Sequence, residues 1–445
     1  MKRIFSVVAI VIVSSVLLAC GESTTATEYL NNGKRYLANG EQAAATIELK
    51  NALKSDGKSA EARWLLGKIY FDQDDMPSAE KELRHARQLG FAADQVLPLL
   101  AQAYLRQAKF DELLALPVEG LAADSLATLL SAQGLAKLAE GEADAAGELI
   151  ERAVIAAPQL AYAQMARARL LQASGEIALL RAQLDTIFAI DPAYSPALSL
   201  LGDLELQQKK LEAAEQAYTR AIDTGTSGVT QFADRLKRAL VLIALQQYDA
   251  AQVDASYLLA RAPKHPSAHY VQGLIHFQQK KVAEARAAFD QALPAKERYP
   301  QVLYYLAALH LLEGSREQAT AFASEFYGIA PGNIAGRKLL ATIRLDEKEY
   351  TQVEALIRPV LALGQNDAAA MNLLANALLR QGKTDEAIDL LSEVAELEPD
   401  SPMAQMRLGA GMLAGGEQGG VEHIESALRL NPDNQQGEIL LVLNY

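Results

Sequence analysis

The sequence predicts an all-α fold, a right-handed α-solenoid of about twelve helix-turn-helix repeats. Two series of small or aliphatic residues predict it, together with prolines that recur in phase with them. Most intervals in the first series are 34 residues, with one of 33 and one of 37, and the second series follows the first by 12 residues. The first series is Gly33, Gly67, Ala101, Gly134, Ala168, Gly202, Ala239, Gly273, Ala307, Ala341, Ala375 and Gly409, and the second is Ala45, Ala79, Leu113, Ala146, Leu180, Ala214, Ala251, Ala285, Ala319, Val353, Ala387 and Val421.

Each repeat is expected to begin with a helix centred on a residue of the first series. A small side chain there allows the second helix, which carries the second series, to cross closely, while large apolar residues such as Trp64 and Tyr70 fill the space around it. A turn such as Asn39-Gly40-Glu41 separates the two helices. The second helices are expected to end before prolines, which cannot continue a helix. These prolines are Pro158, Pro192, Pro263, Pro331, Pro399 and Pro432.

The 34-residue period resembles that of the tetratricopeptide repeat, which is a pair of antiparallel helices. Such repeats stack so that each contacts only its neighbours. We therefore expect residues 20–445 to form one continuous solenoid whose last repeat is incomplete. The segment 223–228 produces the 37-residue interval, and we interpret it as a surface loop, with a flexible joint as the alternative.

The first 19 residues are typical of a lipoprotein signal peptide. Lys2 and Arg3 precede an uncharged run from Ile4 to Ala19, which is short for a membrane-spanning helix. The run ends in Leu-Leu-Ala-Cys-Gly, which resembles the bacterial lipobox, and Cys20 is the only cysteine of the chain. This resemblance implies lipidation at Cys20 and a lipid-anchored protein of the cell envelope. By analogy with enterobacterial sorting, Gly21 implies the outer membrane, with the protein facing the periplasm.

Composition excludes several kinds of function. Removal of the signal peptide would leave 40 basic against 55 acidic residues, a formal net charge of −15. Nucleic-acid binding depends on cationic contacts with phosphates, so no nucleic-acid partner is expected. The sequence contains no Gly-x-Ser-x-Gly motif and no zinc-protease motif, and it offers no cysteine nucleophile. We expect no enzyme activity, no catalytic residue and no cofactor.

Two motifs invite a chemical interpretation but have a simpler structural one. Residues 52–59 and 377–384 match a loose phosphate-loop pattern, but both fall at turns of the repeat, without the preceding strand that such a loop needs. His265 and His269 are four residues apart and could share a metal. No nearby cysteine or acidic cluster completes a ligand set, and His276 and His310 occupy a packing position of the repeat, so no metal site is expected.

The remaining candidate for function is the concave surface that stacked first helices produce. The repeat register directs a set of aromatic and polar side chains towards it, and exposed aromatic faces are good anchors for peptides or sugars. Packing in the core is the alternative interpretation of the aromatic residues, and an ordinary solvated face is that of the asparagines. The candidate groove residues are Trp64, Lys68, Phe71, Tyr270, Phe277, Tyr304, Asn372 and Asn376.

The segment from Ala44 to Gly90, followed by Asp94-Gln95-Val96-Leu97-Pro98-Leu99-Leu100-Ala101, is distinctive. With the lipobox before it, the chain resembles the tetratricopeptide-repeat lipoproteins of the PEP-CTERM/exosortase system, the PrsT family. The resemblance implies a scaffold encoded with exopolysaccharide genes, and it transfers no catalytic residue. Members of that family are usually longer, and this chain ends inside a first helix exposing Leu440, Leu441 and Leu443, so a truncated chain is expected.

The sequence thus predicts a lipid-anchored periplasmic scaffold. Its expected partners are cell-envelope proteins of exopolysaccharide biosynthesis and export or of PEP-CTERM protein sorting. Two alternatives remain open: a general outer-membrane assembly scaffold for β-barrels, secretins or pili, and an accessory factor that binds polysaccharide directly through Tyr270 and Phe277.

Overall fold

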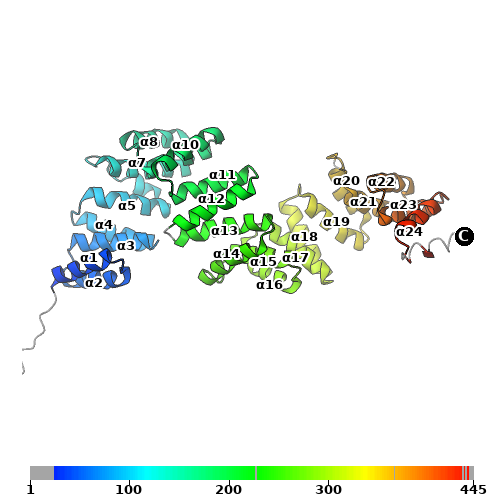
Figure 1. Ribbon diagram of the computed structural model, residues 1–445, viewed down its shortest axis with the longest axis horizontal. Coiled ribbons are helices and arrows are strands. Elements are labelled where there is room, and N and C mark those ends of the chain that lie inside the picture. The colour runs from blue at the N-terminus through cyan, green and yellow to red at the C-terminus, as the bar shows by residue number, and fades with distance from the viewer. Residues whose placement is uncertain (1–24, 226–227, 365, 433–434, 436–437, 440–445) are drawn as a thin grey trace, which may run out of the picture. The chain divides into compact units, whose positions relative to one another are not determined.

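The computed structural model describes residues 25–225, 228–364, 366–432, 435 and 438–439, and in these residues it contains helices and no strand. The helices alternate between first and second members of a pair (Figure 1). The first members are α1 (Ala26–Ala38), α3 (Ala60–Asp72), α5 (Ala93–Arg106), α7 (Ala123–Ala139), α9 (Ala161–Ala173), α11 (Ser195–Gln207), α13 (Gly228–Ala244), α15 (Pro266–Gln278), α17 (Gln301–Leu312), α19 (Ile334–Asp346), α21 (Ala368–Arg380) and α23 (Pro402–Ala414). The second members are α2 (Gln42–Ser55), α4 (Met76–Gln88), α6 (Phe110–Leu114), α8 (Ala143–Ala156), α10 (Ile177–Ile190), α12 (Leu211–Thr224), α14 (Tyr248–Arg261), α16 (Val282–Ala292), α18 (Arg316–Ile329), α20 (Tyr350–Leu361), α22 (Thr384–Leu397) and α24 (Gly420–Leu430).

The predicted all-α solenoid of helix pairs is confirmed. Every residue of the first series lies on a first helix and is buried, and those of the second series lie on second helices, where only Val421 is half-buried. At Gly202 a Cβ atom would lie 2.5 Å from the Tyr218 ring, and at Gly273 it would lie 2.7 Å from the Phe289 ring. The glycines therefore allow a large ring of the second helix to lie against the first.

The turns inside the pairs reveal a third series that follows the first by seven residues. In each turn, this residue has a positive φ angle, the left-handed conformation that ends helices and favours glycine. Glycine occupies six of these turns, at Gly40, Gly141, Gly175, Gly314, Gly382 and Gly416, and other residues occupy the rest, at Asp74, Ala108, Lys209, Gln246, Lys280 and Lys348.

The third repeat departs from the expected regular pattern, because its second helix, α6, is only 5 residues long. Pro117 follows α6 closely, and a proline at that position would clash with the carbonyl group of Leu113 if the helix continued. The buried Gln133 of α7 donates its side-chain amide to the carbonyl oxygens of Leu113, at 3.2 Å, and Leu116, at 3.3 Å. The Leu113 oxygen also accepts a hydrogen bond from the Leu116 amide at 3.2 Å, whereas the Leu116 oxygen has the Gln133 amide as its donor.

The chain divides into two compact units, which we call unit 1 (Met1–Leu245) and unit 2 (Gln246–Tyr445). Within each unit the second helix of one pair packs on the first helix of the next, as α4 does on α5 and α20 on α21. The expectation of one continuous solenoid over residues 20–445 stays a prediction. No helix in the described residues is both long and apolar enough to span a membrane.

Several predictions concern residues outside the described part of the chain. The signal peptide and the lipidation site Cys20 lie there, and so do Leu440, Leu441 and Leu443. The connection between α12 and α13 includes residues 226–227, which are also outside it.

Candidate functional site

The first helices α17, α19, α21 and α23 of unit 2 form the walls of a groove with a volume of about 840 Å³. Its lining side chains repeat at fixed positions relative to the first series. They lie three residues before it (Lys338 and Asn372), two before it (Leu339, Leu373 and Arg407) or one after it (Thr342, Asn376 and Ala410). We call this set of positions the lining register.

Leucines supply much of the groove surface. Leu339 and Leu345 come from α19, Leu373 and Leu379 from α21, and Leu391 from α22. Tyr304 of α17 lies at one end, and its ring packs edge-on against Tyr305 at 5.4 Å between centroids. A partner with apolar side chains can therefore bury them in this groove.

Lys338 and Arg407 give the groove lining its positive charge. The Lys338 ammonium group lies 2.8 Å from the carboxylate of Asp367, which also accepts a hydrogen bond from the Ala370 amide at the start of α21. Burial alone would raise the pKa of Asp367, but these two donors outweigh it and lower that pKa. Arg407 is exposed and forms no ion pair with the described residues, so its charge is available to a partner.

Asn372 and Asn376 differ in their local bonding. Asn372 is half-buried and donates its side-chain amide to the Ala368 carbonyl oxygen at 2.7 Å, while its own Oδ1 atom has no hydrogen-bond donor among the described residues. Asn376, one turn later, is exposed. Because the Oδ1 atom of Asn372 is shielded from solvent, Asn376 is the more accessible of the two amides to a partner.

The structure brings three of the predicted groove residues together, namely Tyr304, Asn372 and Asn376. The sequence-based reasoning missed Lys338, Thr342 and Arg407. Lys338 and Thr342 share the register of the two asparagines relative to Ala341, and that spacing could have identified them.

Tyr270 is not a groove residue in this structure. Its side chain is 7% exposed and stacks on Tyr299 at 4.6 Å between ring centroids. Burial raises its pKa, as expected for a phenol inside the core. The wrong assignment arose because the repeat register fixes the direction of a side chain but not the size of the neighbouring residue that covers it. Phe277 is half-buried, and its ring packs edge-on against Tyr305 at 4.9 Å.

The remaining predicted residues, Trp64, Lys68 and Phe71, lie in unit 1. The Trp64 ring stacks on Phe91 at 5.1 Å and donates its Nε1 hydrogen to the Gln95 carbonyl oxygen at 3.2 Å. The exposed Lys68 lies 6.0 Å above that ring, and the half-buried Phe71 lies 5.1 Å beneath the Arg106 guanidinium. Their binding role stays a prediction.

The histidines are placed by packing and backbone contacts. The His310 ring stacks on Phe322 at 5.6 Å, and His269 Nε2 lies 2.8 Å from the Pro263 carbonyl oxygen. Where the structure describes the chain, no three His, Cys, Asp or Glu side chains come together as metal ligands.

Family models described as tetratricopeptide repeat match residues 30–93, 165–228, 236–302 and 344–411, more than half of the chain. No curated protein sequence is similar enough to match it.

Three solved structures are similar in fold. The APC/C hetero-tetramer Cut9-Hcn1 is 16% identical, with 93% of this chain and 95% of that chain covered and a TM-score of 0.43. PilF of Pseudomonas aeruginosa is 19% identical, with 49% and 99% covered and a TM-score of 0.45. A tetratricopeptide repeat protein from Parabacteroides merdae is 20% identical, with 57% and 98% covered and a TM-score of 0.40.

Proposed function

We propose that this chain, which belongs to the tetratricopeptide-repeat family, is a scaffold that holds a segment of a partner protein in the groove of unit 2. The observation that carries the proposal is the lining of that groove, where leucines and exposed polar groups share one open surface. Peptide segments present the same mixture of apolar side chains and backbone hydrogen-bonding groups.

The leucines and the polar residues of the lining divide the recognition. The leucines bury apolar side chains of the partner, and this contact supplies affinity. Asn372, Asn376 and Thr342 offer donors and acceptors for its backbone, while Arg407 favours a carboxylate at one end. Because these groups stand on rigid helices, little ordering entropy is lost by the scaffold on binding.

We further propose that the scaffold is lipid-anchored at Cys20 and faces the periplasm from the outer membrane. Its partners are proteins of exopolysaccharide biosynthesis and export or of PEP-CTERM protein sorting. The basic, apolar and Leu-Leu-Ala-Cys-Gly parts of the N-terminal sequence support the anchor, and the resemblance of residues 44–101 to the PrsT family supports the pathway.

Site-specific photo-crosslinking in cells tests this function. A crosslinking residue at Asn376 or Thr342 reports on the groove, and one at Glu396, an exposed position of α22 outside the groove lining, is the matched control. We expect partners to be captured from the two groove positions and not from Glu396. Export or exosortase-system proteins among them would support the proposed pathway, whereas barrel-assembly, secretin or pilus proteins would favour a general assembly scaffold. Equal capture at all three positions would contradict binding in the groove.

A further inference from the structure

Three successive first helices of unit 1, α9, α11 and α13, carry polar side chains in the lining register defined by unit 2. Arg169 and Asp203 lie one residue after the first series, Ser199 lies three before it and Lys237 two before it. All four are half-buried. The aliphatic residues in the same register, Met165, Leu200 and Leu236, are buried in the core, and Leu240 is half-buried. The accessible part of this wall is therefore mainly polar, whereas leucines line the groove of unit 2.

The carboxylate of Asp203 in this wall and that of the buried Asp234 of α13 are already paired. Asp203 accepts a hydrogen bond from the Tyr218 hydroxyl at 2.8 Å and lies 2.7 Å from the Lys237 ammonium group. Asp234 is 2% exposed and accepts a hydrogen bond from the Ser199 hydroxyl at 2.5 Å. The protein itself satisfies these acids, so neither requires a ligand.

Arg169 is different, because most of its hydrogen-bonding capacity is unused. Among the described residues, its only side-chain hydrogen bond runs from Nη1 to Gln172 Oε1 at 3.0 Å. Burial lowers its pKa, although Asp203 and Asp234 act in the opposite direction from a distance beyond direct ion pairing. The Arg169 nitrogen atoms that have no hydrogen-bond partner are accessible to solvent. A partly desolvated guanidinium with free donors favours a planar anion that accepts two hydrogen bonds.

Tyr194 lies near this guanidinium, and Tyr162 lies near Tyr194. Tyr194 is near enough to Arg169 and to Tyr162 for the charged forms to interact, and burial raises the pKa of Tyr194 to about 12 and that of Tyr162 as well. Both side chains are half-buried. Within the described residues neither hydroxyl has a hydrogen-bond partner, and both hydroxyls are accessible to solvent. Neutral phenols of this kind can donate to hydroxyl oxygens and present a ring face to a sugar.

We propose that this wall of unit 1 binds a carboxylate-bearing sugar, a uronic-acid unit of an acidic glycan. Arg169 holds the carboxylate in a two-point contact, and Tyr162 and Tyr194 contact the neighbouring hydroxyls. A sugar acid presents one carboxylate and several hydroxyls with little aliphatic surface, which matches a wall of free polar groups. A peptide would find here little of the apolar surface that unit 2 offers.

The test is calorimetric titration of the full chain with a short oligogalacturonate. The comparison ligands are an uncharged galacto-oligosaccharide of equal length and a polyglutamate peptide. Arg169→Gln is expected to weaken oligogalacturonate binding about tenfold or more, because a hydrogen-bonded charge contact is lost. Arg169→Lys keeps the charge without the planar fork and is expected to restore binding only in part. Arg167→Gln is the matched control, since Arg167 lies two residues away on α9, is 45% exposed and is 4.0 Å from Glu151.

Four outcomes would overturn the proposal. The first is that the full chain does not bind oligogalacturonate, and the second is that it binds the uncharged sugar equally well. The third is that the Arg169→Gln and Arg167→Gln variants bind oligogalacturonate with equal affinity. The fourth is that polyglutamate binds more tightly than oligogalacturonate, which would assign the wall to a protein carboxylate. Thermal melts show whether Arg169→Gln still folds, and Arg169→Lys provides the answer if it does not. The result is independent of the groove in unit 2, whose partners are captured at other residues.

Discussion

Gly273 and Gly328 show that the absence of a side chain has opposite consequences at two helical positions of unit 2. A Cβ atom at Gly273 would lie 2.7 Å from the ring of Phe289, which is fully buried and has Tyr270 and Tyr305 as ring neighbours. Nothing lies within 4 Å of a Cβ atom at Gly328, on the exposed face of α18. We expect Gly273→Ala to destabilise unit 2 by about 1–3 kcal/mol and Gly328→Ala to stabilise it by up to about 1 kcal/mol.

Denaturant unfolding followed by circular dichroism measures both changes. Equal effects of the two substitutions would show that helix propensity decides stability and that close packing at Gly273 does not.

Ala108 adopts a conformation that suits glycine, with a φ angle of 54° in the turn between α5 and α6. An alanine in this region is strained by about 1–2 kcal/mol. We expect Ala108→Gly to stabilise this turn by about 1 kcal/mol. Gly141→Ala, at the same place in the next repeat with a φ angle of 83°, is expected to cost a similar amount. Amide hydrogen exchange in the two turns is the measurement, and a loss of protection in Ala108→Gly would contradict the strain argument.

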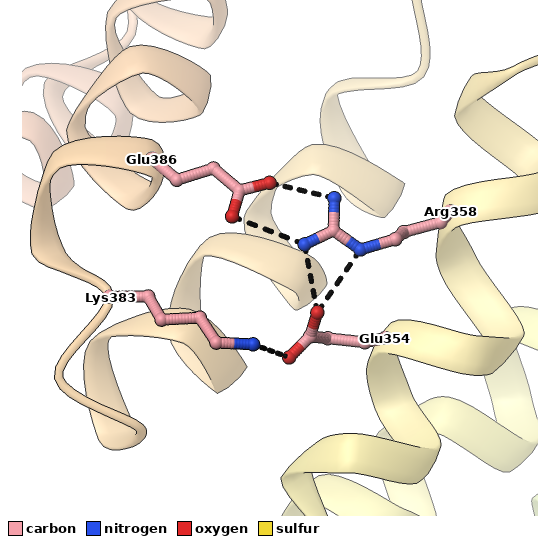
Figure 2. Close-up of polar contacts among 4 residues, drawn as sticks. All are labelled: Glu354, Arg358, Lys383 and Glu386. Atoms are coloured by element: carbon pink, nitrogen blue, oxygen red, sulfur yellow. Dashed lines mark hydrogen bonds and ion pairs between the residues drawn. The ribbon is translucent and has the colours of Figure 1, made fainter.

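Glu354 is one of the two acids in an ion-pair network that joins α20 to α22 (Figure 2). Its carboxylate lies 2.6 Å from the Lys383 ammonium group and 2.8 Å from the Arg358 guanidinium, which also contacts Glu386 at 2.7 Å. The hydrogen bond from Lys383 is the main cause that lowers the pKa of Glu354 from 4.5 to about 2, against the opposing effect of burial.

A folded-state pKa below the unfolded value means that the network stabilises the protein above about pH 4.5 and that this contribution is lost as the pH falls towards 2. We expect Glu354→Gln to reduce stability by about 1 kcal/mol at pH 7, because the partner cations are partly exposed, and by much less at pH 2.5. Unfolding of both proteins across this pH range is the measurement, with Glu396→Gln on the exposed face of α22 as control. A pH-independent difference would rule out the ionised network as its source.

At the scale of helices, the C-terminal end of α6 is hydrogen-bonded to a side chain of another helix, α7. Gln133 of α7 is 5% exposed and bonds to the carbonyl oxygens at the end of α6. Gln133→Leu preserves the bulk but removes the donor of the buried Leu116 oxygen, at a cost of about 1–3 kcal/mol, while the Leu113 oxygen keeps its bond from the Leu116 amide. We expect faster hydrogen exchange in residues 110–122, and unchanged exchange there in Gln207→Leu, at an exposed position of α11. Unaltered exchange in Gln133→Leu would mean that Pro117 alone ends α6.

The helix pairs could be predicted from the sequence because close crossings require small residues, and those residues recur with the repeat. The turn series was harder to find, since six of its members are not glycine and are held in the left-handed conformation by the flanking helices. The groove was predicted only in part. Asn372 and Asn376 lie in it, but Tyr270 is covered by Tyr299, whose position depends on the local path of the chain after α16. Cover of this kind is a tertiary property that no period of the sequence encodes.

At the scale of the whole molecule, the helix pairs depend on their neighbours and not on distant repeats, because the packing in each unit joins successive pairs. Gly67 in unit 1 and Gly273 in unit 2 are equivalent positions for testing this property. A Cβ atom at Gly67 would lie 2.7 Å from the fully buried Leu83 side chain, a distance like that from Gly273 to Phe289.

We expect Gly67→Ala to accelerate hydrogen exchange in α1 to α5 and Gly273→Ala to accelerate it in α14 to α18, each without effect in the other unit. The change in unfolding free energy of the double variant should equal the sum of the changes in the two single variants within about 0.5 kcal/mol, since the sites share no partners.

Hydrogen exchange measured segment by segment is the appropriate readout, because a repeat array need not unfold in one step. If Gly273→Ala instead accelerates exchange in α1 to α4, the two units fold as one cooperative body, and a ligand bound in one unit would then stabilise the other. Strictly local effects would make the groove of unit 2 and the polar wall of unit 1 energetically independent binding surfaces on one scaffold.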